Sequence, residues 1–419
     1  MRDSSVFKSW MLGLLAVGLV SGMLYVLLSY QDASVSAAAP TSGLRDDAVT
    51  GVLTDGEYSY VFLPIVYRDF GPRSSRLGYC ALSRDVSRYP DIRKLSAGWY
   101  LQFTTNPAPP QPMGIEHVQV VRLHQNLECE FWTTRDRDVC PYSDPPTYTI
   151  WSPSGGIPAI RDIAAANPGA LWLIGNEMDR PDWDGGGQDE MLPELYAHAY
   201  HEIHGAIKAA DPTAQVAIGG VIQATKVRME YLTKVWEEYA RAYEGPMPVD
   251  VWNVHNFIFQ ELSQDPDCWE EFAPHGADVP PGYEKCSGAT YDDELHNSMV
   301  LFDAQIRRFR QWMKDHGQQN KPLVVSEYGI VYHHAGMEDF DLVKSFMLDT
   351  FNYFLTTKDT SLGYPADDHR LVQRWAWYSL DDNNFNINQY SYLINPDSGF
   401  LTPLGHVYAD YAQNHLDSP

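Results

Sequence analysis

The sequence predicts an α/β protein in which eight parallel strands close into a barrel, preceded by an N-terminal export segment. Eight short apolar stretches alternate with helix-like stretches, which is the pattern of a parallel sheet covered by helices. The stretches are nearly continuous in apolar character, as expected for parallel strands buried on both faces. With 419 residues, the chain is long enough for one (β/α)8 barrel, or TIM barrel, with long loops.

The first 40 residues are the expected export segment and lie outside the fold. Arg2 and Lys8 precede an uncharged stretch from Trp10 to Tyr30, and residues 31–40 are small and polar, as in a signal peptide. The apolar stretch of about 20 residues is also long enough to span a bilayer. Cleavage with secretion and retention as a single membrane anchor therefore both stay open. Either one places the body of the protein outside the cytoplasm.

Residues 41–75 are expected to be a linker and short N-terminal extension, and residues 76–419 the barrel. The predicted strands are Leu77–Leu82, Gly98–Thr104, His117–His124, Ala170–Gly175, Gln215–Gly220, Val249–Val254, Pro322–Ser326 and Gln373–Ser379. The predicted helices are Ile157–Ala166, Pro193–Ala210, Val227–Tyr243, Asp293–His316 and Phe340–Thr356. A doubly wound open sheet is the alternative fold, but neither a GxGxxG sequence nor a P-loop supports it.

Composition narrows the range of partners. The formal net charge is −25, so a polyanionic partner such as nucleic acid is not expected. Aromatic residues make up 13% of the chain, which fits either a large aromatic core or rings that serve as binding platforms. No oligomeric state is predicted.

Five cysteines fit an oxidising compartment. Cys129 is close in sequence to Cys140, and Cys268 to Cys286, which predicts two disulfides that staple loops. Cys80 is left over within an apolar strand, where we expect a buried free thiol. No CxxC spacing suggests a zinc site.

Two of the predicted strands end in glutamate. The fourth strand runs into Asn176 and Glu177, in the sequence Leu-Trp-Leu-Ile-Gly-Asn-Glu. The seventh runs into Glu327, in the sequence Pro-Leu-Val-Val-Ser-Glu-Tyr-Gly. Side chains at the carboxyl ends of barrel strands point into the mouth where active sites form. Glycosidic cleavage by double displacement needs two carboxyl groups about 5–5.5 Å apart. Salt-bridged rim residues are the alternative interpretation.

With these motifs the chain resembles clan A of the glycoside hydrolases, including the family 5 and family 39 enzymes, over residues 76–411. The resemblance also includes Val-Trp-Asn-Val-His at residues 251–255 on the sixth strand, Arg-Trp-Ala-Trp at 374–377 on the eighth, and the closing residues 395–405. It implies a retaining glycosidase without a metal or organic cofactor. Glu177 would be the general acid/base, protonated at rest, and Glu327 the ionised nucleophile.

The same resemblance suggests roles for other residues. Asn176 would bind a sugar hydroxyl beside the scissile bond, His255 would help to order the nucleophile side, and Trp377 would form the floor under the sugar. His124 at the end of the third strand and Trp183 in the loop after the fourth are further candidates for substrate binding. A turn or core role is the alternative for each of these five residues.

The sequence departs from the clan at one position. Clan members often carry a tyrosine two residues after the sixth-strand histidine, hydrogen-bonded to the nucleophile, whereas this chain has Phe257. Tyr328 or Tyr332 could supply the missing hydroxyl. The departure keeps a second class of function open, a barrel that binds glycan at the cell surface without cleaving it.

A metal-dependent hydrolase, such as a polysaccharide deacetylase, is disfavoured. His198, His201 and His204 lie three residues apart on one predicted helix, unlike the HExxH spacing, and that helix belongs to the outer ring. We therefore expect an extracytoplasmic glycosidase that acts on a β-linked poly- or oligosaccharide. The long loop at residues 260–292 is expected to shape one wall of its cleft.

Overall fold

The computed structural model describes residues 73–129, 137–181, 187–261, 277–283, 288–289, 291, 293–332, 338–384 and 387–415, and the backbone of four short strands before them. The chain divides into two compact units, Met1–Arg68 and Asp69–Pro419. In the first unit, the four strands form two antiparallel pairs: β1 (Val17–Val20) with β2 (Met23–Val26), and β3 (Val52–Asp55) with β4 (Tyr58–Val61).

The expected export segment lies, apart from β1 and β2, outside the described residues. Within the parts of the chain that the structure describes, no helix is both long enough and apolar enough to cross a membrane. Signal cleavage and membrane anchoring therefore stay predictions.

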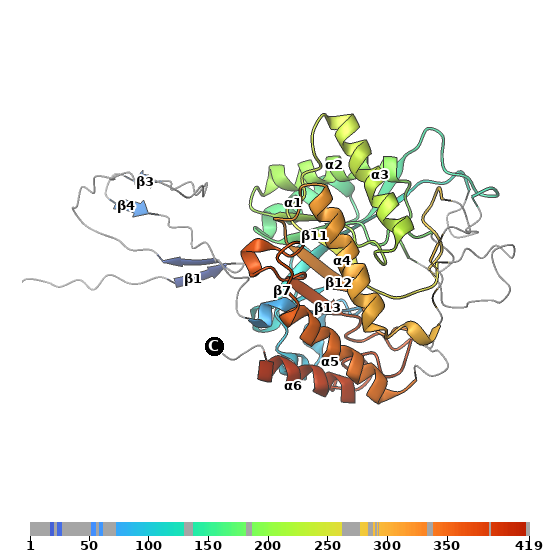
Figure 1. Cartoon of the computed structure of the whole chain (residues 1–419). Coiled ribbons are helices and arrows are strands. Elements are labelled where there is room, and N and C mark those ends of the chain that lie inside the picture. Colours follow the sequence, from blue (N-terminus) through green and yellow to red (C-terminus); the bar gives the residue numbers. More distant parts are fainter. Residues whose placement is uncertain are drawn as a thin grey trace, which may run out of the picture. The chain divides into compact units, whose positions relative to one another are not determined.

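The second unit contains the predicted barrel (Figure 1). Its parallel strands are β5 (Leu77–Cys80), β6 (Trp99–Leu101), β7 (Glu116–Gln125), β9 (Leu171–Ile174), β10 (Gln215–Ile218), β11 (Trp252–His255), β12 (Leu323–Glu327) and β13 (Arg374–Trp377). They are hydrogen-bonded in the order β10-β9-β7-β6-β5-β13-β12-β11. Parallel bridges from Ala217 to Val251 and from Val221 to Val254 join β10 to β11 and close the sheet. All eight predicted strands are confirmed.

Helices cover the outside of the strands (Figure 1). They are α1 (Gly156–Ala166), α2 (Pro193–Ala210), α3 (Lys226–Tyr243), α4 (Met299–Asp315), α5 (Phe340–Thr356) and α6 (Pro403–His415). The first five confirm the predicted helices, whereas α6 was not predicted. The helix expected from residue 293 begins six residues later, because Ser298 caps α4 by accepting a hydrogen bond from the Leu301 N–H. Residues 293–295 form a separate 3-10 turn.

An additional strand, β8 (Tyr148–Ser152), was not predicted. It runs antiparallel to the carboxyl-terminal half of β7, with Ser152 opposite Arg122 and Tyr148 opposite Gln125. The Ser152 hydroxyl lies 2.7 Å from that of Thr104, just beyond the end of β6. Strand β8 therefore raises the barrel wall above β6, on the side of the mouth.

Strand alternation divides the buried side chains into two layers. One apolar cluster fills the barrel interior and includes Val118, Val120, Leu171, Val251 and Ala376. The other lies between the strands and the helices and contains the intervening residues, such as Val121, Trp172, Trp252, Trp375 and Trp377.

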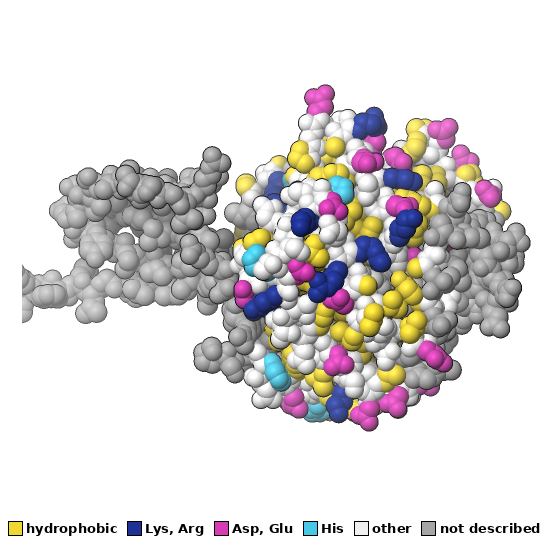
Figure 2. Space-filling view, in the orientation of Figure 1, with side chains coloured by type: hydrophobic (Ala, Val, Ile, Leu, Met, Phe, Trp, Pro, Cys, Tyr) yellow, Lys and Arg dark blue, Asp and Glu magenta, His cyan; other side chains and the backbone are white. Residues whose placement is uncertain are grey.

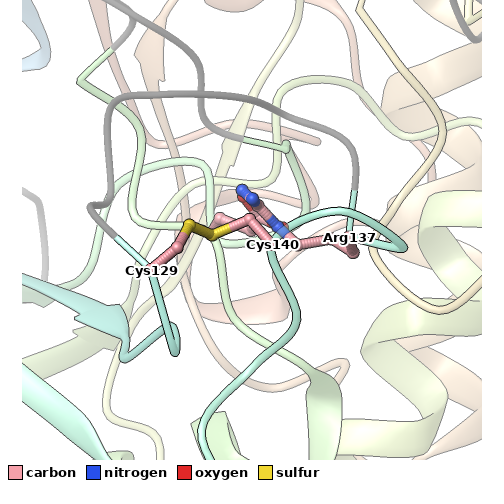
Figure 3. The surroundings of a disulfide bond; sticks show 4 residues. Cys129, Arg137 and Cys140 are labelled. Carbon is pink, nitrogen blue, oxygen red and sulfur yellow. A yellow bond between two sulfur atoms is a disulfide. The ribbon is translucent and has the colours of Figure 1, made fainter.

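The disulfide between Cys129 and Cys140 is present, with a Cα–Cα distance of 5.6 Å (Figure 3). Cys80 is free and buried, as predicted, and its thiol donates a hydrogen bond to the Ser326 carbonyl at 3.1 Å. Cys268 and Cys286 lie outside the described residues, so their pairing stays a prediction. On the face that Figure 2 shows, acidic and basic side chains are interspersed with apolar ones among the described residues.

Candidate active site

A sharp turn after β9 places Glu177 at the mouth of the barrel. Gly175 has a φ of 90° and Glu177 a φ of 52°, both in the left-handed region that few residues with a side chain adopt. A Cβ atom at residue 175 would lie 2.9 Å from Met178, so only glycine fits there. The Glu177 N–H donates to the Gly220 carbonyl at 3.0 Å, and the Glu177 side chain is 4% exposed. The backbone at Glu177 is therefore strained, as is often seen at functional sites, and the turn directs the carboxyl group of this residue into the mouth.

Glu327 ends β12 on the opposite side of the mouth and is 5% exposed. One oxygen of its carboxyl group lies within 4.8 Å of one oxygen of Glu177 and of a ring nitrogen of His255. This separation fits the close carboxyl pair of retaining glycosidases and is shorter than the roughly 6.5–9.5 Å of inverting ones. The two strand-terminal glutamates that the sequence singled out are therefore brought together.

The imidazole of His255 lies between the two carboxyl groups. Its Nδ1 is 3.2 Å from Glu177 Oε1 and its Nε2 is 3.2 Å from Glu327 Oε1. Gly220 leaves room for the ring, because a Cβ atom there would lie 2.2 Å from His255 Cδ2. The Nδ1 contact is a hydrogen bond, whereas Nε2 lies at ion-pair distance from Glu327 Oε1. Because one buried imidazole lies this close to two acids, the ionisation of each of the three groups depends on the other two.

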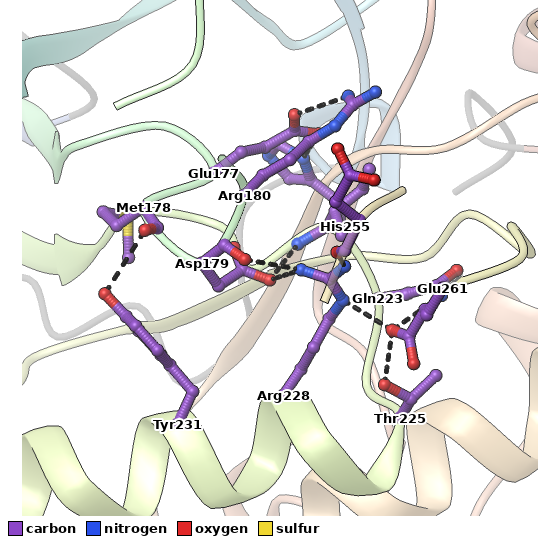
Figure 4. A network of polar contacts seen from close by, with 12 residues as sticks. Glu177, Met178, Asp179, Arg180, Gln223, Thr225, Arg228, Tyr231, His255 and Glu261 are labelled. Carbon is purple, nitrogen blue, oxygen red and sulfur yellow. Dashed lines mark hydrogen bonds and ion pairs between the residues drawn. The ribbon is translucent and has the colours of Figure 1, made fainter. Parts of the chain in front are cut away.

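Arg180 lies beside Glu177 and decides which of the two glutamates holds a proton more readily (Figure 4). Its Nη1 donates to Glu177 Oε2 at 3.1 Å. Burial alone raises the pKa of Glu177, but the charges of Arg180 and His255 outweigh it and lower this pKa. Burial and the charge of Glu177 raise the pKa of Glu327 to about 7, against the opposing effect of His255. In the substrate-free site these charges favour the proton on Glu327, and the expected resting state, with Glu177 protonated and Glu327 ionised, stays a prediction.

Asn176 is fixed through its backbone. The buried carboxylate of Asp189 accepts a hydrogen bond from the Asn176 N–H at 2.8 Å and one from Arg122 Nε at 3.0 Å. The charge of Arg122 also acts on Glu327. Asp189 and Arg180 were not singled out from the sequence, because they lie in the loop after β9 and no strand-end pattern marks them.

Trp377 does not lie where the resemblance placed it. It is fully buried among the helix-side residues, its ring packs edge-on against Tyr328, and its Nε1 donates to the Ser391 carbonyl at 2.7 Å. The next residue, Tyr378, packs instead on the interior cluster and is partly exposed. The aromatic side chain of the eighth strand that faces the mouth is therefore Tyr378.

Of the two tyrosines proposed for the hydroxyl missing at Phe257, Tyr328 points away from the cleft and Tyr332 pairs with Arg180. Tyr328 is fully buried, and its hydroxyl accepts a hydrogen bond from Thr350, away from the cleft. Tyr332 packs against Phe259 with ring centroids 5.3 Å apart, and its hydroxyl pairs with Arg180. The side chain that contacts Glu327 is His255.

The remaining sequence candidates have different outcomes. His124 is partly buried on the interior-facing side at the end of β7, whereas Trp183 lies outside the described residues. His198 and His201 each pair with a tyrosine of α3 on the outer ring. Among the described residues, the set of potential metal ligands that converges is Glu177, His255 and Glu327.

A second network behind the site ties down the loop that carries Glu177 (Figure 4). Arg228 near the start of α3 forms ion pairs with Asp179 and Glu261, and all three side chains are 0% exposed. Glu261 also accepts hydrogen bonds from Thr225 and Gln223, at 2.6 and 2.9 Å. The network thereby joins the loop after β9 to the loop after β11.

Replacing Arg228 with methionine should destabilise the fold by about 3–5 kcal/mol, because it leaves Asp179 and Glu261 buried without their cation. Urea unfolding measures the change, and circular dichroism checks that the variant folds. The control is Arg241→Met, which removes an exposed arginine from the same helix and should leave the unfolding midpoint unchanged. Equal midpoints for the two variants would show that the buried network contributes no stability.

No protein-family model and no curated protein matches the sequence. The solved structures similar to this chain include a family 128 endo-β-1,3-glucanase from Sorangium cellulosum, with 16% identity, 80% of this chain and 97% of that chain covered, and a TM-score of 0.46. A β-1,3-glucanase and allergen of Cryptomeria japonica pollen has 14% identity and a TM-score of 0.42, with 78% of this chain and 97% of that chain covered.

A family 39 glycoside hydrolase from Bacteroides cellulosilyticus has 11% identity and a TM-score of 0.44, with 94% of this chain and 71% of that chain covered. These neighbours are glycoside hydrolases by description, and one of them belongs to a family that the sequence motifs resemble. The likeness concerns the arrangement of strands and helices, so the chemistry of this chain has to follow from its own side chains.

Proposed function

We propose that this chain is a retaining glycoside hydrolase that cleaves a β-linked poly- or oligosaccharide. The observation that carries the proposal is the buried pair of Glu177 and Glu327, whose nearest oxygens lie within 4.8 Å at the mouth of the barrel. A pair this close has no room for a water molecule between one carboxylate and the sugar. One carboxylate therefore attacks the sugar directly.

In this mechanism Glu327 attacks the anomeric carbon while Glu177 gives a proton to the leaving oxygen. The bond to the leaving sugar breaks and a glycosyl ester of Glu327 forms. Water then attacks the same carbon, Glu177 takes up its proton, and the ester is released as free sugar. The two roles follow the clan A resemblance, in which the residue after the fourth-strand asparagine is the acid/base.

The acid role requires the proton on Glu177, whereas the charges of the substrate-free site favour it on Glu327. His255 contacts both carboxyl groups and provides the route: Nε2 takes the proton of Glu327 while Nδ1 gives one to Glu177. A sugar hydroxyl that draws Arg180 away from Glu177 would favour this transfer, because Arg180 stabilises the ionised form of Glu177.

The setting of the reaction is proposed to be extracytoplasmic. The export segment and the Cys129–Cys140 disulfide support an oxidising compartment. The N-terminal segment is either cleaved or retained as an anchor at the outer face of the membrane. The partner is a carbohydrate, and no cofactor is needed, because proton transfer and nucleophilic attack use the side chains alone.

Replacing Glu327 with alanine should lower kcat by about four orders of magnitude or more on any β-glycan that the wild type cleaves. Azide should restore turnover of this variant and give a glycosyl azide of inverted configuration, because the anion enters the space that the carboxylate leaves. Glu177→Ala should instead retain activity on aryl glycosides whose leaving groups need no proton, and azide should give the retained product. Product analysis by NMR distinguishes the two.

Glu230→Ala, on the exposed side of α3, is the control and should match the wild type. Wild-type turnover in both active-site variants would refute the catalytic roles. Binding of glycan by the wild type without release of reducing ends would favour the alternative, a non-catalytic surface-binding barrel.

The pH profile of kcat/KM should be bell-shaped, because turnover needs one proton on the carboxyl pair. The raised pKa of Glu327 places the loss of that proton near pH 7, so activity should fall as the pH rises through about 7. The lowered pKa of Glu177 places the acidic limb below the ordinary glutamate value of 4.5. Arg180→Gln removes a positive charge and should move both limbs to higher pH. Loss of activity on the alkaline side already below pH 4.5 would contradict the raised pKa of Glu327. A pH profile that Arg180→Gln leaves unchanged would contradict the role of Arg180 in setting the two pKa values.

A further inference from the structure

Trp151 on β8 is an exposed aromatic side chain directed towards the barrel mouth. Its neighbour Ile150 and, two residues before Ile150, Tyr148 pack against the helix-side core. Ile150 pairs with Leu123 and Ser152 with Arg122, so Trp151 lies at a bulge between them. Its contact with Arg122, an interior-side residue of β7, places its ring on the side of the cleft. Trp151 is 44% exposed there. A tryptophan is seldom left this open, since its ring contributes much apolar area when it is covered.

The indole of Trp151 is supported by one cation and stays 44% exposed. The guanidinium carbon of Arg122 lies 4.5 Å from the centroid of the Trp151 ring, in a cation–π arrangement. Arg122 is itself held by the buried carboxylate of Asp189 through Nε at 3.0 Å. The ring is therefore held in place before any ligand arrives, which lowers the entropy lost on binding.

The supporting arginine links this ring to the reacting groups. Arg122 follows Val118 and Val120 on the interior side of β7, and its charge acts on Glu327. Asp189, which binds Arg122, also accepts a hydrogen bond from the Asn176 N–H at 2.8 Å. Trp151 thus contacts an arginine whose charge acts on one of the two reacting carboxyl groups.

We propose that Trp151 is the stacking platform of a sugar subsite next to the one in which the bond is cleaved. The subsite takes a pyranose unit of a β-linked glucan, because equatorial hydroxyl groups leave the two faces of such a ring rich in C–H groups. An apolar C–H face matches the exposed part of the indole, and the hydroxyl groups stay in water at the edge of the sugar ring. This inference rests on the proposed glycosidase function.

The test compares kcat/KM for the wild type, Trp151→Ala and Trp151→Phe on a ladder of β-1,3- and β-1,4-linked glucose oligosaccharides and on an aryl β-monoglucoside. On oligosaccharides long enough to reach the platform, Trp151→Ala should lose about tenfold or more in kcat/KM, mainly through KM. The aryl monoglucoside does not extend to the platform, so its turnover should change by less than about twofold. Trp151→Phe keeps a flat ring and should recover most of the loss.

The control is Met113→Ala, which removes an exposed apolar side chain just before β7, at the opposite end of the barrel. It should match the wild type on every substrate. Equal losses for Trp151→Ala on long and short substrates would overturn the subsite and give the ring a role in holding Arg122. No loss on any substrate would overturn it as well.

If the protein is not a glycosidase, the wild type releases no sugar from any oligosaccharide of the ladder. Calorimetry then measures binding of the same oligosaccharides. About tenfold weaker binding by Trp151→Ala would then still support the platform, whereas unchanged binding would overturn it.

Discussion

The interaction on which the site depends is the contact of one imidazole with two buried carboxyl groups. Glu177 and Glu327 are each about 95% buried, and two bare carboxylates this close would repel each other strongly in a medium of low dielectric constant. His255 lies 3.2 Å from both and supplies a proton or a positive charge between them. The barrel makes this possible, because β9, β11 and β12 each deliver one of the three residues to the same end of the sheet.

Two buried polar networks stabilise the strained backbone on which Glu177 lies. The backbone at Glu177 has a positive φ, and buried ion pairs lie on either side of it along the chain. Asp189 with Arg122 fixes the residue before Glu177, and Arg228 with Asp179 and Glu261 fixes the loop after it. Such buried pairs add little stability compared with apolar packing, so their presence here is better explained by the positions they impose.

Much of the fold was predictable from the sequence because its signals are local. Eight apolar runs gave the eight strands, and α2 was predicted with its observed bounds because Pro193 begins it and Asp211 and Pro212 follow its end. Strand β8 was missed because it belongs to no βα unit, and among the described residues the strand with which it pairs is β7. Its position could not be inferred before the barrel was known.

The site was predictable as far as strand ends define it. Glu177, Glu327 and His255 follow apolar runs and meet as expected. Trp377 was misplaced by one residue, because a shift of one position along a strand reverses the side to which a side chain points, and only the barrel interior shows which of Trp377 and Tyr378 faces inward. The charge balance between the two glutamates depends on Arg180, whose contact with Glu177 arises from the loop conformation and not from a sequence pattern.

The central claim is that Glu327 forms a covalent bond to the sugar. The most direct measurement is to incubate the protein with a 2-deoxy-2-fluoro β-glycoside bearing an activated leaving group, which slows release of the glycosyl ester, and to map the modified peptide by mass spectrometry. The account predicts one added glycosyl group, on the peptide that contains Glu327, and none in the Glu327→Ala variant. A label on Glu177 would reverse the two roles, and turnover of the reagent without any labelled peptide would contradict the double-displacement mechanism.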